Sequence, residues 1–277
     1  MSTHTDYAPN EDDTPTFRLT IVEGNSIKLL LELLEYYLCS TISVNLNSAG
    51  LSIMENNDAK NCSIHVNIDK TKTDGYICET PRTIMFTNTM IVKTFKSSVR
   101  SSDRITLAIH RENPDILCFY IYEKEADRYH SRMDIPITDS RPQKIGSIEY
   151  TRHITMDCGF FKSRCKGMVK VSDKVEIVAD SPGQIKFISR GATLSDVKIY
   201  RGVTVKYTKE EKAAWKTYSS TFPVTHISKI ALLCYNNKRN IKWNIPDDSE
   251  DALSIRLPLG DVGEMIIYLR QKSESND

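Results

Sequence analysis

Residues 153–188 read HITMDCGFFKSRCKGMVKVSDKVEIVADSPGQIKFI, and this stretch decides the fold. It places a strand pattern first, a helical pattern second, and two strand patterns after them. The two later strands meet at a turn that contains Gly183. The stretch therefore predicts one helix between antiparallel strands.

The same order of patterns occurs earlier in the chain. The matching segments are FRLTIVEG at 17–24, SIKLLLELLEYYL at 26–38 and SVNLNSAGLSIM at 43–54. The spacing from helix lysine to turn glycine agrees within one residue between the copies, Lys28 to Gly50 and Lys162 to Gly183. The pattern match indicates an internal duplication.

The later part of each copy repeats as well. At one constant interval the residues Lys93, Ile105 and Leu117 are followed by Lys229, Ile241 and Leu253. Each set lies in a helix–strand–turn–strand order. Two copies of a long unit predict a pseudo-symmetric molecule.

Strand patterns dominate, and only four segments are predicted as helices: 26–38, 89–99, 159–170 and 223–235. The expected class is α+β, with duplicated βαβββ units, antiparallel sheets and the helices on one face. We expect a disordered tail (1–16), an N-terminal domain (17–123), a charged connector with one short extended stretch (124–149), a C-terminal domain (150–270) and a polar tail (271–277).

Composition excludes several function classes. The 277 residues carry a net charge of +1, so there is no global basic excess. No apolar run approaches the length of a membrane span, and no membrane partner is expected. Seven cysteines without a CxxC pair and six histidines without an HExxH spacing favour a reducing compartment and no metal site. No cofactor or catalytic residue is predicted.

Basic residues form stripes on the predicted helices, opposite the apolar ones. Taken helix by helix, such a stripe is usually only the solvated face of an amphipathic helix. Helices of a duplicated unit lie on one side of the sheets, however, so their basic faces would form one surface that contacts a phosphate backbone. The candidate DNA-binding residues are Lys28, Lys93, Lys96, Arg100, Lys162, Lys166, Lys170 and Lys229.

Five segments together resemble the proliferating cell nuclear antigen (PCNA) family of sliding clamps. The resemblance covers about residues 17 to 270. Near the C-terminus LGDVGEMIIYLRQK is similar to the family's signature, in which Asp-x-Gly leads into a strand with an aromatic end. The other segments are IVEGNSIKLLLELL, SSDRITLAIHRENPDILCFYI, MDCGFFKSRCKGMVKVSDKVEIVADSPGQIKF and the connector MDIPITDSRPQKIGSIE. The near-neutral charge departs from the acidic cellular members and indicates a divergent version, such as a viral one.

The resemblance implies a ring of three chains around duplex DNA, with helices lining the hole. Edge strands of neighbouring chains would pair, residues 116–122 of one with residues 196–200 of the next. The interface residues implied are Ile116, Cys118, Tyr120, Asp196, Lys198 and Tyr200.

The resemblance also implies partners. A groove beneath the connector would bind short peptides with aromatic anchors, carried by DNA polymerase and other replication proteins. Its residues would be Met54, Ile145, Gly146, Ile148, Leu253 and Tyr268. A clamp loader, a homotrimer and a nuclear location are implied too, or a cytoplasmic replication site for a viral member.

Two other functions are compatible with the sequence. The chain could be one subunit of a heteromeric, checkpoint-type ring, or a replication or transcription adaptor that does not encircle DNA. An enzyme acting on nucleic acid lacks support, because no paired carboxylates, phosphate-binding loop or nucleophile–base arrangement is found.

Overall fold

The structure is a computed structural model of the whole chain. It describes residues 14–22, 24–37, 41–57, 59–87, 91, 94, 98–123, 128–142, 148–202, 208, 210, 215–234, 240–248 and 251–271.

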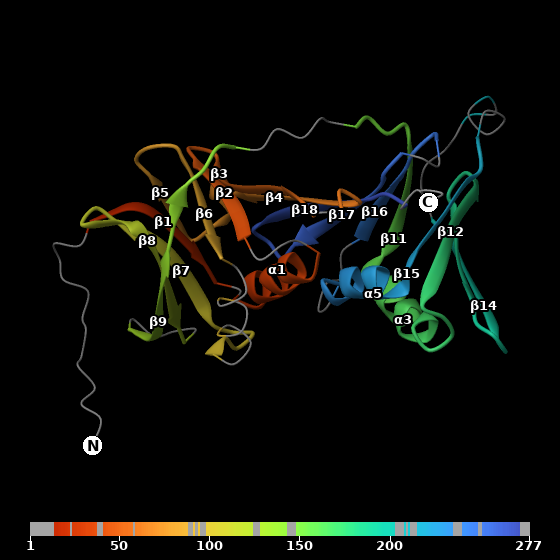
Figure 1. Cartoon of the computed structure of the whole chain (residues 1–277), viewed down its shortest axis with the longest axis horizontal. Coiled ribbons are helices and arrows are strands. Elements are labelled where there is room, and N and C mark those ends of the chain that lie inside the picture. Colours follow the sequence, from red (N-terminus) through yellow and green to blue (C-terminus); the bar gives the residue numbers. More distant parts are fainter. Residues whose placement is uncertain are drawn as a thin grey trace, which may run out of the picture.

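Four units with the order strand–helix–three strands make up the chain (Figure 1). The first unit consists of β1 (Pro15–Ile21), α1 (Gly24–Tyr37), β2 (Thr41–Asn47), β3 (Gly50–Asn56) and β4 (Cys62–Asp69). The third consists of β11 (Arg152–Asp157), α3 (Cys158–Met168), β12 (Lys174–Ser181), β13 (Gln184–Arg190) and β14 (Ser195–Arg201). These two units are the copies from which the duplication was inferred.

The second and fourth units complete the two halves. The second comprises β6 (Arg82–Thr87), β7 (Arg104–His110), β8 (Asn113–Tyr122) and β9 (Tyr129–Pro136). Of its expected helix at 89–99, the described residues Ile91, Thr94 and Ser98 are helical. The fourth comprises β15 (Tyr218–Pro223), α5 (Val224–Leu232), β16 (Asn240–Ile245), β17 (Leu253–Leu259) and β18 (Gly263–Leu269). Additional elements are η1 (Lys70–Lys72), β5 (Gly75–Cys78) and β10 (Thr138–Asp139).

Three antiparallel sheets result from this order. A nine-stranded sheet runs β10-β6-β2-β3-β4-β18-β17-β16-β11 and crosses from one half of the chain to the other at the β4–β18 pair. A five-stranded sheet, β5-β1-β7-β8-β9, belongs to the N-terminal half. A four-stranded sheet, β14-β13-β12-β15, belongs to the C-terminal half. The two halves are therefore joined by main-chain hydrogen bonds as well as by the covalent chain.

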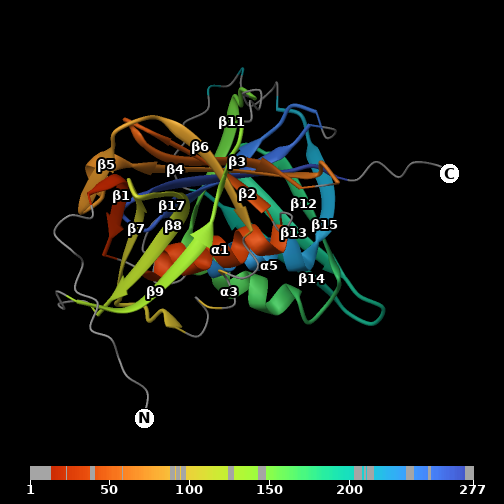
Figure 2. The same ribbon diagram turned by 60° about the vertical axis from the view of Figure 1, so that its left-hand side comes forward.

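The helices α1, α5 and α3 follow one another on one side of the nine-stranded sheet (Figures 1 and 2). Helix α5 lies between the other two and packs against both. The predicted class, α+β with duplicated units and helices on one face, is confirmed.

Aromatic packing beneath α3 shows why this helix is amphipathic. Phe161, on the buried side of α3, meets Trp243 of β16 at a ring distance of 5.3 Å and 78°, and Phe187 of β13 lies 5.4 Å from the same indole. All three side chains are at most 1% exposed. Such edge-to-face contacts add to the area that these large side chains bury, so they fix α3 on its sheets.

The prediction that residues 124–149 form a connector is wrong over much of its length. Strand β9 pairs along β8, with Leu117 opposite Ile135, and β10 pairs with β6. Residues 133–136 of the short extended stretch MDIPI are the end of an eight-residue strand of the N-terminal sheet. A charged composition suggested a linker, but an edge strand needs apolar side chains on one face only.

Candidate nucleic-acid interface and partner surfaces

Helix α3 presents the clearest basic surface on the helical side of the molecule. The carboxylate of Asp157 caps it by accepting a hydrogen bond from the backbone N–H of Phe160 at 2.7 Å. Cys165 and Met168 are buried against α5 and the sheets. The opposite side of the helix therefore faces solvent.

The basic residues of this region are accessible to different degrees. Lys166 is exposed, Lys162 is half-buried, and Lys170 is exposed in the turn that follows the helix. The sequence interpretation missed Arg164, which is exposed and places its guanidinium 4.8 Å from the centre of the Phe160 ring. Its lack of i, i+4 spacing with the lysines kept it out of the predicted stripe. Two lysines and an arginine on one helix suit contact with phosphates.

The other predicted DNA-binding residues are more constrained. The Lys28 ammonium donates to the backbone oxygen of Val99 at 3.3 Å and is half-buried. Arg100 forms an exposed ion pair with Glu123 at 3.3 Å. Lys229 is exposed, and its ammonium lies 5.2 Å from the centre of the Tyr36 ring. Lys93 and Lys96 lie outside the described residues, so their place on this face stays a prediction.

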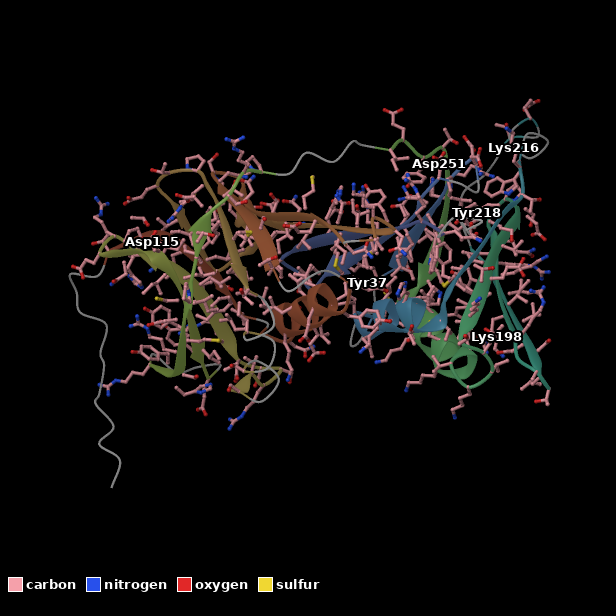
Figure 3. All side chains as sticks on the ribbon, in the orientation of Figure 1. Tyr37, Asp115, Lys198, Lys216, Tyr218 and Asp251 are labelled. Atoms are coloured by element: carbon pink, nitrogen blue, oxygen red, sulfur yellow. The ribbon has the colours of Figure 1, made fainter. Side chains whose placement is uncertain are left out.

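The junction of α1 and α5 carries the exposed Lys229 beside Tyr36 and a neutral histidine. Burial lowers the pKa of His226 at the start of α5, so this ring is neutral at neutral pH. The Tyr37 hydroxyl donates to the backbone oxygen of His226 and links the two helices. Figure 3 shows Tyr37 at the end of α1 that faces α5. Among the described residues, three of the exposed cations considered for this face, Arg164, Lys166 and Lys170, lie on or just after α3.

The predicted subunit edge at residues 116–122 is not an edge. Strand β8 lies between β7 and β9 in the five-stranded sheet. Cys118 and Tyr120 are buried in a small cluster on the face of that sheet. The physical reason is that β9 takes the hydrogen-bonding groups that β8 would otherwise offer to another chain. The edges of this sheet are β5 and β9, and no described strand pairs with the outer side of β9.

The predicted edge in the C-terminal half is an edge. Strand β14, which carries Asp196, Lys198 and Tyr200, ends the four-stranded sheet. Strands β9 and β14 lie at opposite ends of the long axis of the molecule (Figure 1). In Figure 3, Asp115 near the β9 end and Lys198 on β14 mark these two ends.

Of the strands that end the three sheets, β9 and β14 correspond to the two strands that join the halves internally. By the order of the units, β9 is the last strand of its half, as β18 is of the other, and β14 is the counterpart of β4. β18 and β4 pair with each other inside the chain. Joining β9 to β14 of another copy would place eight strands, β1-β7-β8-β9-β14-β13-β12-β15, in the same order as their counterparts β11-β16-β17-β18-β4-β3-β2-β6 in the existing nine-stranded sheet.

A pocket of about 240 Å³ lies at the outer end of the β4–β18 junction. Tyr268 and Ile148, both predicted groove residues, line it. Its remaining lining residues are Asn56, Lys60, Asn61, Cys62, Ser63, Ala252 and Arg270. Lys60 and Arg270 are exposed, and none of the described lining residues is acidic. The lining of the pocket therefore combines the apolar side chains of Ile148, Ala252 and Tyr268 with neutral polar ones and two exposed cations.

Two predicted groove residues do not line this pocket. Leu253 is fully buried, because β17 lies between β16 and β18 and turns this side chain into the core. Met54 is half-buried on β3 and is not among the lining residues. Ile145 and Gly146 lie outside the described residues. Sequence patterns missed Ala252, whose backbone oxygen accepts a 2.6 Å hydrogen bond from the Tyr150 hydroxyl.

Neither a metal centre nor a membrane helix is found in the described part of the chain. No three His, Cys, Asp or Glu side chains cluster there in a way that could hold a metal ion. None of the described helices combines the length and the apolar character needed to cross a membrane.

Comparisons with known proteins identify relatives and structures that are similar to this chain. No protein-family model matches the sequence. The "Probable DNA polymerase sliding clamp 1" of Paramecium bursaria Chlorella virus 1 is 24% identical over 169 residues, which cover 61% of this chain. The match spans 64% of the length of that relative.

Two solved structures are similar over nearly the whole chain. PCNA from Thermococcus kodakaraensis has a TM-score of 0.73 at 16% identity, covering 92% of this chain and 99% of its own. Proliferating cellular nuclear antigen from Entamoeba histolytica has the same TM-score at 15% identity, covering 94% and 100%. At these identities the likeness shows the fold.

Proposed function

We propose that this chain, which has the fold of PCNA, is a sliding clamp that closes with further copies of itself around duplex DNA. The observation that carries the proposal is the correspondence of the free edges β9 and β14 with the internal pair β18 and β4. A head-to-tail interface of this kind generates either a ring or an open filament. The resemblance to clamps favours a closed ring of three chains.

The helical face would form the inner wall of such a ring. Its exposed cations on and after α3, Arg164, Lys166 and Lys170, would contact the phosphate backbone. Contacts of this kind carry no sequence information, so they let a ring slide. Lys162 and Lys229, on either side of the α3–α5 contact, would also contact phosphates. In the N-terminal half the same role would fall to Lys28, Lys93, Lys96 and Arg100.

The pocket at the β4–β18 junction would bind the partners. Its volume suits one aromatic side chain of a short peptide, anchored beside Tyr268 and Ile148. The cations Lys60 and Arg270 at the rim favour a peptide with acidic residues beside that anchor. We propose that DNA polymerase and other replication proteins bind in this way, and that a clamp loader places the ring on DNA.

The chain would carry out no chemistry of its own in this role. It would raise the processivity of a polymerase by topology, and it would act where cellular or viral DNA is replicated, the nucleus being the compartment implied by the resemblance. The complementary edges on a single chain favour a homomeric ring over a heteromeric one or a non-encircling adaptor.

Retention on circular DNA tests the proposal. Loaded protein should stay on a closed circle in high salt and leave when the circle is cut once, because a ring slides off an end whereas an ordinary DNA-binding protein does not. The loader of the same replication system would be supplied with ATP. Equal retention on circular and linear DNA would contradict encirclement.

A further inference from the structure

Two exposed cations of the helical face lie over aromatic rings. The ammonium of Lys229 in α5 is 5.2 Å from the centre of the Tyr36 ring. The guanidinium of Arg164 in α3 is 4.8 Å from the centre of the Phe160 ring. Both distances are shorter than the separation of about 6 Å within which the quadrupole of a ring attracts a cation. Each of these cations therefore has a preferred position above an aromatic face.

The Tyr36 ring is held in place by its neighbours. It lies at the end of α1, where this helix meets α5 (Figures 1 and 2). The ring is 4.9 Å from the Tyr37 ring at 90° and 5.7 Å from the His226 ring at 88°. The Tyr37 hydroxyl in turn donates to the backbone oxygen of His226. Because Tyr36 is also 38% exposed, its ring is both fixed in the helical layer and accessible to Lys229.

The Phe160 ring is held in a similar way. It lies 4.9 Å from the ring of Tyr200 on β14. The backbone N–H of Phe160 donates to the carboxylate of Asp157, which caps α3. Arg164 follows one helical turn later, and this spacing brings its guanidinium over the ring. Phe160 is half-buried whereas Arg164 is exposed, so a fixed ring carries an accessible cation.

An aromatic ring positions a cation without neutralising it. Arg100, by contrast, forms an ion pair with Glu123 at 3.3 Å, so its charge is partly compensated within the chain. Lys28 is half-buried and donates to the backbone oxygen of Val99. A cation above a ring keeps its formal charge for an external anion, because the ring carries no net charge.

We infer that Tyr36 and Phe160 are positioning residues for DNA, which hold the Lys229 ammonium and the Arg164 guanidinium where these groups contact the phosphate backbone. This inference rests on the proposed contact of the helical face with duplex DNA. A long cationic side chain loses rotamer freedom when it is fixed against a phosphate. A ring that already restricts the side chain reduces this loss, as preorganisation does in other binding sites.

The inference gives helix α1 a part in DNA binding that its own charge does not provide. This helix carries one lysine, Lys28, and two carboxylates, Glu32 and Glu35. Its side chains therefore have a net negative charge. Through Tyr36, however, α1 holds a cation that belongs to α5 in the other half of the chain. Both halves would consequently contribute to the same phosphate contact.

Binding of the full chain to a labelled linear duplex, followed by fluorescence anisotropy over a salt series, tests the inference. Tyr36→Leu and Phe160→Leu keep an apolar side chain and remove the aromatic face. Each should weaken binding at a fixed low salt concentration by about two- to fivefold, which corresponds to the loss of one exposed cation–π contact. Tyr36→Phe keeps the aromatic face and should bind like the wild type.

Double variants show whether each ring acts through its cation. Lys229→Ala alone should reduce the slope of log affinity against log salt by about one unit, as the loss of one phosphate contact does. Adding Tyr36→Leu to this variant should cause no further loss of affinity, because the ring then has no cation to position. Arg164→Ala and Phe160→Leu should combine in the same way.

The position of Lys229 can also be observed without DNA. In the wild type the ring current of Tyr36 should shift the NMR signals of the Lys229 ε-methylene protons upfield. Tyr36→Leu should abolish this shift, whereas Tyr36→Phe should preserve it. The signals are assigned by their disappearance in Lys229→Ala.

A third aromatic–cation pair of the chain provides the matched control. The Arg104 guanidinium lies 4.5 Å from the centre of the Tyr122 ring. Tyr122 packs against the small cluster that contains Cys118 and Tyr120, apart from the main core. Tyr122→Leu should therefore leave DNA binding unchanged. Urea unfolding checks that each variant folds, and Tyr36→Leu, which alters an exposed ring, decides the question if Phe160→Leu does not fold.

The possible results separate this inference from the proposed clamp. Wild-type affinity in both leucine variants would overturn the positioning role, and so would a further loss when Tyr36→Leu is added to Lys229→Ala. Wild-type affinity in Lys229→Ala and Arg164→Ala would overturn it as well, since these cations would then not contact DNA. In each of these cases a protein that stays on circular DNA and leaves cut DNA would remain a clamp. Equal retention on both would contradict the clamp itself.

Discussion

Gly263 of β18 lies so close to β4 that a β-carbon added there would be 2.0 Å from the backbone oxygen of Asn67. This contact explains the glycine in the segment DVGEMIIYL on physical grounds. No other residue lets the two strands that join the halves approach at this register.

Gly263→Ala should therefore lower the free energy of unfolding by about 2–4 kcal/mol, because strand backbone has to move to admit the methyl group. Urea unfolding followed by circular dichroism measures the change. Gly75→Ala is the matched control, since a β-carbon there would meet Thr20 at an ordinary 3.8 Å. Equal stabilities of the two variants would refute this account of Gly263.

Removing the cations of α3 should weaken binding to linear duplex DNA, where no topological link holds the protein. The variant Arg164→Ala/Lys166→Ala should lose this binding at a lower salt concentration than the wild type. It should also reduce the slope of log affinity against log salt by about 2, one unit for each lost phosphate contact. Lys70→Ala/Lys72→Ala, in the exposed η1 turn, should behave as wild type.

Cross-linking can test the register between copies. Ile135 is the counterpart of Leu269, because Leu117 and its repeat equivalent Leu253 face these residues. Arg201 is the counterpart of Asp69, because Gln184 and Gly50, which start equivalent strands, face them. The internal pair Ile266–His65 therefore corresponds to Arg132 of one copy opposite Val197 of the next. A mixture of Arg132→Cys and Val197→Cys chains should form disulfide-linked dimers on mild oxidation, since directly opposed strand residues meet the distance that a disulfide needs.

The matched control shifts the second cysteine along the strand. Arg132→Cys mixed with Ile199→Cys should cross-link far less, because the partner position is displaced by two residues. Preferential linking to position 199 would show that the register differs from the internal one.

Substitutions at the pocket should separate binding from folding. Tyr268→Ala should weaken binding of an aromatic-anchored acidic peptide at least about tenfold, as loss of a central anchor commonly does. Leu253→Ala, by contrast, should cost about 2–5 kcal/mol of stability, because the side chain is fully buried. Fluorescence anisotropy with a labelled peptide and urea unfolding measure the two effects.

The charge of the rim can be tested with the same peptide. Lys60→Glu/Arg270→Glu should weaken the acidic peptide and should leave a neutral version with the same anchor nearly unaffected. An equal loss for both peptides would indicate damage to the pocket rather than a charge effect.

Stability should decrease as the pH falls below neutrality. Burial lowers the pKa of His65 and of His226, so both rings stay neutral in the folded chain when they would bind protons in the unfolded one. Their contribution is fully present above the unfolded pKa of about 6.5 and is lost as pH falls through the lowered folded pKa.

Urea unfolding midpoints between about pH 7.5 and about pH 5 measure this loss. The variant His65→Gln/His226→Gln cannot titrate in that range and should show a flatter profile. The wild-type slope should exceed that of the variant, and identical slopes would rule out these two histidines as the cause.

Much of the architecture was predictable because it depends on local pattern. The helices at 26–38, 159–170 and 223–235 were placed within a few residues, since each combines an apolar stripe with clear ends. The edge strand β9 was not found, although the duplication contained the signal. Leu117 and Leu253 are equivalent, and the strand that follows Leu253, β18, requires a counterpart after Leu117.

The candidate site was predictable only in part. Sequence spacing identified Lys166 and Lys170 but missed Arg164, and it did not show that Lys28 bonds to Val99. It also assigned Leu253 to a groove, because an apolar residue in a strand has the same pattern in a core and in a pocket.

The sequence by itself determined the order of strands and helices, their alternation of buried and exposed residues, and the duplication, since these follow from periodicity along the chain. Only the tertiary structure decided which strands end the sheets. Pairing depends on residues far apart in sequence, and a strand's own pattern does not say whether one side stays open. That difference moved one side of the proposed contact between copies from β8 to β9 and left the other side, β14, where the sequence had placed it.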